Sequence, residues 1–250
     1  MTRKLGREFM RLTQYPYLEP ADQVLEKPQP PLVKTVAGET HLVLPLPTEI
    51  DAGEVNLTLP LQQAIERRVS LRRYSGEALS LAQLSYLLWS TQGVRRIQGT
   101  AATLRTVPSA GARHALETYL LVNRVNGLEP GLYRFLPLEH QLAVVNLAPD
   151  MAEQVTDACL KQKFVRESAV TFIWTAVPYR MTWRYSERGY RYLHLDAGHV
   201  CQNLYLAAEA LDAGVCAIAA FQDERLNEVL GVDGEGEFAI YVATVGRKPG

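Results

Sequence analysis

The sequence has little cysteine, no long apolar run and almost no net charge, and each absence excludes a class of protein. The three cysteines, Cys159, Cys201 and Cys216, form neither a C-x-x-C pair nor a disulfide framework, which favours a reducing compartment. No apolar run approaches the roughly 20 residues that span a bilayer, and the charged segment 1–13 lacks the apolar core of a signal peptide. We therefore expect a cytoplasmic protein with no membrane association.

The charge balance and the missing phosphate-binding loops narrow the possible partners. Lys and Arg total 26 against 27 Asp and Glu, so the net charge of −1 gives no overall field that would attract nucleic acid. The sequence contains neither G-x-x-x-x-G-K-[ST] nor a strand-linked G-x-G-x-x-G, which argues against a P-loop NTPase and a Rossmann dehydrogenase. The five histidines are scattered without metal-ligand spacing. We expect no nucleic-acid partner and no metal site.

Proline is distributed unevenly along an otherwise ordinary globular composition. Of the 14 prolines, eight fall within the first 60 residues, where they prevent a long helix. We therefore predict a Pro-rich N-terminal extension over residues 1–55, with a short helix near Lys4–Leu12 and an edge strand over Thr40–Leu46. A single compact domain is expected over residues 56–250.

Hydrophobic periodicity predicts an α+β fold within that domain. One helix begins at Leu59, and a second is capped by Ser80 and stopped by Gly93. The pattern then predicts an antiparallel meander, a helix, a buried central strand, a long helix closed by Gly214 as its C′ residue, a helix capped by Asp223, and a final strand. In order, these elements cover residues 117–125, 131–135, 141–145, 150–161, 169–177, 193–211, 223–230 and 237–245, with a short apolar stretch at 215–221.

Two basic segments are candidates for chemistry. If residues 68–72 are extended, Arg68, Ser70 and Arg72 lie on one side, which suits a phosphate; the alternative is a solvated basic patch. The Arg/Tyr-rich segment 183–192 has the composition of surfaces that stack on planar or anionic groups, although a charged helix face has the same composition.

The order of several short blocks resembles the nitroreductase superfamily. The blocks are Arg68-x-Ser70-x-Arg72-x-Tyr74, Pro108-Ser109-Ala110-Gly111, Asp196-Ala197-Gly198-His199 with Gln202-Asn203, the stretch 214–221, and Gly246-Arg247. The resemblance covers residues 56–250. The Pro-Ser-Ala-Gly block, the Arg/Tyr-rich segment and the Pro-rich extension are most similar to the SagB-type dehydrogenase branch, which includes azoline oxidases.

The resemblance implies a nitroreductase-like α+β fold, with an antiparallel-rich central sheet wrapped by helices, in an intertwined homodimer that binds two FMN molecules at its interface. Small residues on the long helix would permit close approach of two helices across the dimer axis. The implied FMN-binding residues are Arg68, Ser70 and Arg72 for the phosphate, ribityl chain and pyrimidine edge; Pro108, Ser109, Ala110 and Gly111 from the other subunit; Ala217, Ile218, Ala219 and Ala220 near flavin N5; and Arg247 as a further phosphate contact.

The resemblance also implies a reaction. Azoline oxidases resemble this chain at a Lys-Tyr pair implicated in substrate deprotonation, and the pair is Arg184-Tyr185 here. Arginine stays protonated, so Tyr185 is the better proton acceptor. We expect hydride transfer through flavin N5 in a ping-pong cycle, with a peptide azoline or a related small molecule as substrate. The alternatives are an NAD(P)H-dependent nitro or quinone reductase and a non-catalytic protein that binds flavin or a partner.

Overall fold

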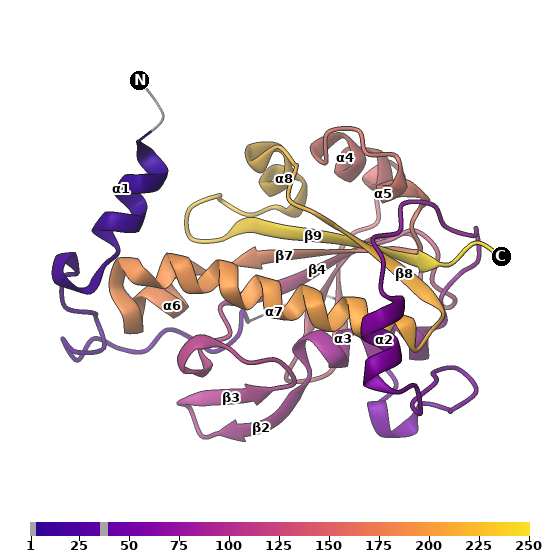
Figure 1. The fold of residues 1–250 in the computed structure, drawn as a ribbon, viewed down its shortest axis with the longest axis horizontal. Coiled ribbons are helices and arrows are strands. Elements are labelled where there is room, and N and C mark those ends of the chain that lie inside the picture. Colours follow the sequence, from indigo (N-terminus) through magenta and orange to yellow (C-terminus); the bar gives the residue numbers. More distant parts are fainter. Residues whose placement is uncertain (1–3, 36–39) are drawn as a thin grey trace.

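The computed structural model describes residues 4–35 and 40–250, and its centre is a seven-stranded sheet (Figure 1). The strand order is β1-β6-β5-β4-β7-β9-β8, and every neighbouring pair is antiparallel. The strands are β1 (His41–Val43), β4 (Leu116–Val122), β5 (Gly131–Leu136), β6 (Gln141–Asn146), β7 (Val170–Ala176), β8 (Ala213–Ile218) and β9 (Phe238–Arg247). The predicted antiparallel-rich sheet, its β4-β5-β6 meander and its buried strand β7 are confirmed.

Helices cover both faces of the sheet. Successive side chains of a strand point to opposite faces, so the neighbours of β7 side chains show which helices lie on each face. On β7, Phe172 and Trp174 pack in the same core as α3 (Leu81–Gln92) and α7 (Gly189–Glu209). Ile173, between them, packs in a second core with α4 (Met151–Ala158) and α8 (Asp223–Leu230). The α+β class and the wrapping of the sheet by helices are therefore confirmed.

The ends of the helices follow the sequence signals in part. Ser80 caps α3 as predicted, since its hydroxyl accepts a hydrogen bond from the Gln83 amide at 3.1 Å, and Gly93 follows the last helical residue. Two predicted caps are wrong. Helix α7 ends at Glu209, and Gly214 lies within β8. Asp223 is the first residue of α8, whose N-cap position is Gln222.

A second sheet was not predicted. Strands β2 (Val94–Gln98) and β3 (Ala102–Arg105) form an antiparallel hairpin in a stretch for which the sequence pattern predicted no element. Most of β2 is exposed and carries no alternation of apolar and polar residues. The remaining helical segments are α2 (Leu61–Arg67), α5 (Phe164–Glu167), α6 (Pro178–Tyr185) and the 3₁₀ turns Tyr15–Tyr17, Pro47–Glu49, Ala110–Ala112 and Ser186–Arg188.

Two predicted elements of the N-terminal segment are present in the described residues. Helix α1 (Leu5–Leu12) projects from the body of the molecule (Figure 1), and β1 forms one edge of the sheet. Residues 44, 50 and 55 contribute buried apolar side chains to the core shared by α3 and α7. In the described parts of the chain, no helix has the length and apolar character needed to cross a membrane.

Candidate functional site

The segment after α2 is extended, as the phosphate-binding hypothesis required. Ser70 forms a parallel bridge with Val215 of β8, and the Leu71 amide donates to the Val215 carbonyl at 2.9 Å. The close fit requires glycine at position 214, because a Cβ there would lie 2.4 Å from Cδ2 of Leu71. Residues 68–73 are thereby held along β8, next to the stretch at 217–220.

Tyr205 of α7 contacts both segment 68–73 and the stretch 217–220, and together they form a first cluster. Its hydroxyl accepts a hydrogen bond from the Ala217 amide at 2.9 Å and lies 3.0 Å from the Ser70 hydroxyl oxygen. The guanidinium of Arg68 lies over the Tyr205 ring, 5.3 Å from its centroid. Sequence reasoning missed Tyr205, which is 8% exposed and whose hydroxyl contacts depend on the packing of α7 against β8. The structure therefore brings Arg68, Ser70 and Ala217 together.

The other predicted residues near β8 differ in accessibility. Arg72 is exposed, as are Ala219 and Ala220, whereas the side chain of Ile218 is buried in the core formed with α4 and α8. Gln162 donates to the Ala220 carbonyl at 3.0 Å and fixes the turn after β8. Only the backbone of Ile218 can therefore face a ligand on the side of Ser70.

The Arg247 guanidinium makes hydrogen bonds within the chain. Its guanidinium donates from Nη1 to the Leu211 carbonyl and from Nη2 to Oε1 of Gln83, at 3.2 Å for the second bond. These bonds tie the end of β9 to α3 and to the turn after α7. No contact in the described residues brings the Arg247 guanidinium to Ser70, so its phosphate contact stays a prediction.

A second cluster forms around the Pro108–Gly111 turn. The Ser109 hydroxyl accepts a hydrogen bond from the His114 amide at 2.9 Å, and the Ala110 amide donates to Oδ1 of Asp196 at 3.3 Å. Asp196 is only 4% exposed; burial raises its pKa, while hydrogen bonds from Ser109 and Ala110 oppose that shift. Two of the sequence blocks, Pro108–Gly111 and Asp196–His199, thus meet in space.

The Arg184-Tyr185 pair belongs to this second cluster. Gly111 has a φ of +58°, and a Cβ there would lie 2.5 Å from the Tyr185 hydroxyl oxygen and 2.8 Å from Nε of Arg184. Tyr185 in turn stacks edge-on against Tyr192 of α7, with ring centroids 4.9 Å apart. Arg184 is exposed and Tyr185 is half-buried. The turn and the pair form one accessible cationic and phenolic surface at the N-terminal end of α7.

The two clusters do not meet within one chain. Asp196 marks one cluster on α7 and Tyr205 marks the other, nine residues later. Nine residues of α-helix correspond to about 14 Å of rise and about two and a half turns, so the two side chains leave α7 on opposite sides. The described residues also contain no group of three or more His, Cys, Asp or Glu side chains that could hold a metal ion.

Sequence comparison identifies relatives of the chain. Residues 65–247 match the Nitroreductase family. A Methanocaldococcus jannaschii protein assigned by name to the nitroreductases is 36% identical over 188 residues, which are 75% of this chain and 91% of that protein. The trifolitoxin-processing protein TfxB of Rhizobium leguminosarum bv. trifolii is 29% identical over 168 residues, which are 66% of this chain and 45% of TfxB.

Solved structures share the fold. An Anabaena variabilis protein assigned to the nitroreductases has a TM-score of 0.69 and 33% identity, covering 84% of this chain and 42% of its own. A chain of the E. coli microcin synthetase McbBCD complex with truncated pro-MccB17 has a TM-score of 0.61 at 15% identity, covering 98% and 92%. A Desulfovibrio desulfuricans protein assigned to the nitroreductases, in complex with FMN, has a TM-score of 0.53 at 18% identity, covering 76% and 87%.

The chain spans less than half the length of TfxB and of the Anabaena protein, and it spans most of the Methanocaldococcus protein. The family match covers most of this chain, and the 36% identical relative is matched almost throughout. On these grounds, the chain belongs to the nitroreductase family of oxidoreductases.

Proposed function

We propose that the protein is an FMN-dependent oxidoreductase. The observation that carries the proposal is the extended segment 68–72, held along β8 with Arg68, Ser70 and Ala217 gathered around Tyr205. When bound, FMN would supply a hydride acceptor and donor at its N5 atom, in a ping-pong cycle of two half-reactions. The complex of a fold relative with FMN supports the same assignment.

The residues of the first cluster suit the parts of FMN. Arg68 and Arg72 carry guanidinium groups that bind phosphate through charged hydrogen bonds, and the exposed Ser70 hydroxyl can bind a ribityl or phosphate oxygen. A cation near the pyrimidine edge would stabilise the reduced, anionic ring. Ala217, Ala219 and Ala220 have small side chains that leave space for a flat ring beside β8.

The site is complete only in a homodimer, on this proposal. Because the Pro108–Gly111 turn and the Arg184-Tyr185 pair lie on the other side of α7, a second subunit would bring its own copy of that cluster to the flavin. The exposed stripe of α7 includes Leu195, which is 59% exposed, and Gly198, where a Cβ would meet nothing within 4 Å. Such a surface allows two helices to approach closely.

The proposed substrate is a peptide azoline or a related small molecule, in a SagB-type dehydrogenation. The similarity to TfxB, a trifolitoxin-processing protein, supports a peptide substrate. Tyr185 would accept the substrate proton as its phenolate and become the neutral phenol, and the guanidinium of Arg184, 5.7 Å from the Tyr185 ring centroid, would stabilise the phenolate before the transfer. NAD(P)H-dependent reduction of a nitro or quinone compound is the second candidate, favoured by the similarity to the Methanocaldococcus protein.

The FMN assignment is tested by R68A/R72A. Two charged hydrogen bonds to a phosphate are each worth about 1.5–3 kcal/mol, so we expect FMN affinity to fall by a factor of at least about 100. Bound flavin is measured from the visible spectrum, and the released chromophore is identified by chromatography. R67A/R73A is the matched control, since it removes the same charge from the same basic run at two exposed positions and should keep its FMN. Full FMN occupancy in R68A/R72A overturns the phosphate assignment.

A further inference from the structure

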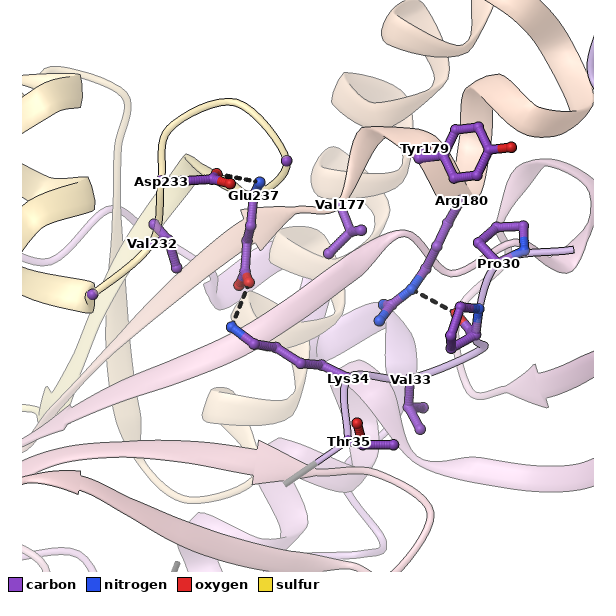
Figure 2. Close-up of a pocket in the computed structure, with 13 residues that line it drawn as sticks. Pro30, Val33, Lys34, Thr35, Val177, Tyr179, Arg180, Val232, Asp233 and Glu237 are labelled. Carbon is purple, nitrogen blue, oxygen red and sulfur yellow. Dashed lines mark hydrogen bonds and ion pairs between the residues drawn. The ribbon is translucent and has the colours of Figure 1, made fainter. Parts of the chain in front are cut away.

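A cavity of about 610 Å³ lies outside both clusters, between the N-terminal segment 30–35, helix α6 and the loop that precedes β9 (Figure 2). Its volume is in the range of small-molecule sites. Much of its wall is apolar and comes from Pro30, Pro31, Val33, Val177 and Val232. Segments far apart in the sequence therefore line an open pocket suited to an apolar ligand body.

One ion pair and one hydrogen bond hold the N-terminal segment against this cavity, next to a second ion pair that is buried. Nζ of Lys34 lies 2.6 Å from Oε2 of Glu237, and Nη1 of Arg180 lies 2.6 Å from Oε1 of Glu117. Nε of Arg180 also donates to the Pro31 carbonyl at 3.0 Å. Arg180 and Glu117 are 5% and 4% exposed at their side chains, so neither charge is left to water.

The acidic groups at the cavity already have their donors within the chain. Oε1 of Glu237 accepts from the Thr175 hydroxyl at 2.6 Å, and Oε2 accepts from Lys34. Oδ1 of Asp233 accepts from the amides of Glu235 and Glu237 at 3.0 and 2.9 Å. Both oxygens of Glu237 and one oxygen of Asp233 therefore already accept hydrogen bonds within the chain.

The cationic groups have N–H donors that make no hydrogen bond within the described residues. Lys34 uses two of its three N–H donors, on Glu237 and on the Tyr119 hydroxyl. Nη2 of Arg180 makes no hydrogen bond within residues 4–35 and 40–250. Figure 2 shows the charged ends of Lys34 and Arg180 on either side of the space beside Val177. Lys34 and Arg180 therefore offer unused hydrogen-bond donors at the cavity.

The buried charges behind the cavity leave one cation in excess. Arg105 and Arg180 are 3% and 5% exposed, and both interact electrostatically with Glu117, which is 4% exposed. Lys34 and Glu237 balance each other, and Asp233, on the cavity wall, is exposed and accepts hydrogen bonds from amides of its own loop. A ligand carboxylate near Arg180 would therefore compensate a buried cation.

We propose that this cavity binds a small organic molecule with one carboxylate on an apolar body. The carboxylate lies between Lys34 and Arg180, and the apolar part contacts the proline and valine wall. The inference does not depend on flavin binding or on the proposed reaction. Because Arg180 belongs to α6 and Lys34 to the N-terminal segment, the bound molecule would join these two elements.

Three eight-carbon probes test the charge preference on the full-length protein with its natural cofactor content. Octanoate, octylamine and octanol share the apolar body and differ only in the head group. By isothermal titration calorimetry we expect saturable one-to-one binding of octanoate and at least tenfold weaker binding of the other two. Octylamine or octanol binding as tightly as octanoate, or no binding of octanoate, overturns the proposal.

Cavity-filling variants test whether octanoate binds in this cavity. V33W fills the cavity from the N-terminal segment and should lower octanoate affinity at least tenfold, whereas V43W adds the same bulk at a position 71% exposed on β1 and should leave it unchanged. V232W, on the opposite wall, serves if V33W does not fold. Unchanged octanoate binding in a folded cavity-filling variant places the probe elsewhere and overturns the proposal.

Discussion

The hydroxyl of Tyr205 contacts two parts of the candidate flavin site, so its removal tests the two hydrogen bonds while the ring stays in place. In Y205F the Ala217 amide and the Ser70 hydroxyl each lose a partner, while the ring remains to contact Arg68. Since an intramolecular hydrogen bond contributes about 1 kcal/mol, we expect FMN affinity to fall roughly tenfold, with a loss of about 1–2 kcal/mol in the free energy of unfolding. Fluorescence titration with FMN and urea denaturation measure the two effects.

Y133F is the matched control for that residue. The Tyr133 hydroxyl donates to the Glu129 carbonyl at 2.7 Å, and Tyr133 lies on β5, which β4, β7 and β9 separate from β8, so loss of the hydroxyl should lower stability and leave FMN affinity unchanged. Equal FMN affinity in Y205F and the wild type would show that the Tyr205 hydroxyl does not organise the site.

Single residues also show what the sequence could predict. Arg68, Ser70 and Arg72 were predicted to act together because alternate residues of an extended segment share a side, which depends only on local geometry; the bridge from Ser70 to β8 agrees with the extension, and their binding role stays a prediction. Tyr205 was not predicted from the sequence, because its contacts depend on how α7 packs against β8. Gly214 was misassigned for the same reason: a glycine shortly after a helix is a usual C′ residue, and its actual role is set by Leu71.

At the scale of elements, the docking of segment 68–74 on β8 should depend on Gly214. In G214A the new Cβ would lie 2.4 Å from Cδ2 and 2.7 Å from Cβ of Leu71, so the segment must shift. Overpacking of this kind costs about 1–3 kcal/mol, and we expect weaker FMN binding as well. Urea denaturation and FMN titration measure both. G76A, where a Cβ meets nothing within 4 Å, should leave both values near those of the wild type; the same result in G214A would contradict the close fit.

The elements that sequence patterns predicted are those with strong periodicity or with clear residues at their boundaries. Helix α3 has a capping residue and a terminal glycine, and β7 is an unbroken run of buried β-forming residues. The β2-β3 hairpin has neither signal, since four of the five residues of β2 are exposed. Its pairing depends on contact between two strands, which a pattern within one strand does not contain.

At the scale of the whole molecule, the separation of the two clusters on α7 leads to a test of a shared site. If each site combines residues 68–72 of one subunit with the Gly111 turn of the other, two defective subunits can complement each other. R68A/R72A and G111V should each lose FMN as homodimers, the second because a side chain at this positive φ meets Tyr185 and Arg184. A mixed dimer would have one intact site and one with both defects.

Co-expression of the two variants under different affinity tags allows the mixed dimer to be purified. We expect a particle of twice the 27.9 kDa chain mass by light scattering, carrying one FMN per two chains where each parent carries little. Two differently tagged copies of R68A/R72A form the control and should carry none. Every chain of the mixed dimer contains one defect, so a site built within a single chain would remain empty. Recovery of half the flavin therefore requires that the two clusters come from different subunits, and its absence in a stable mixed dimer would contradict the shared site.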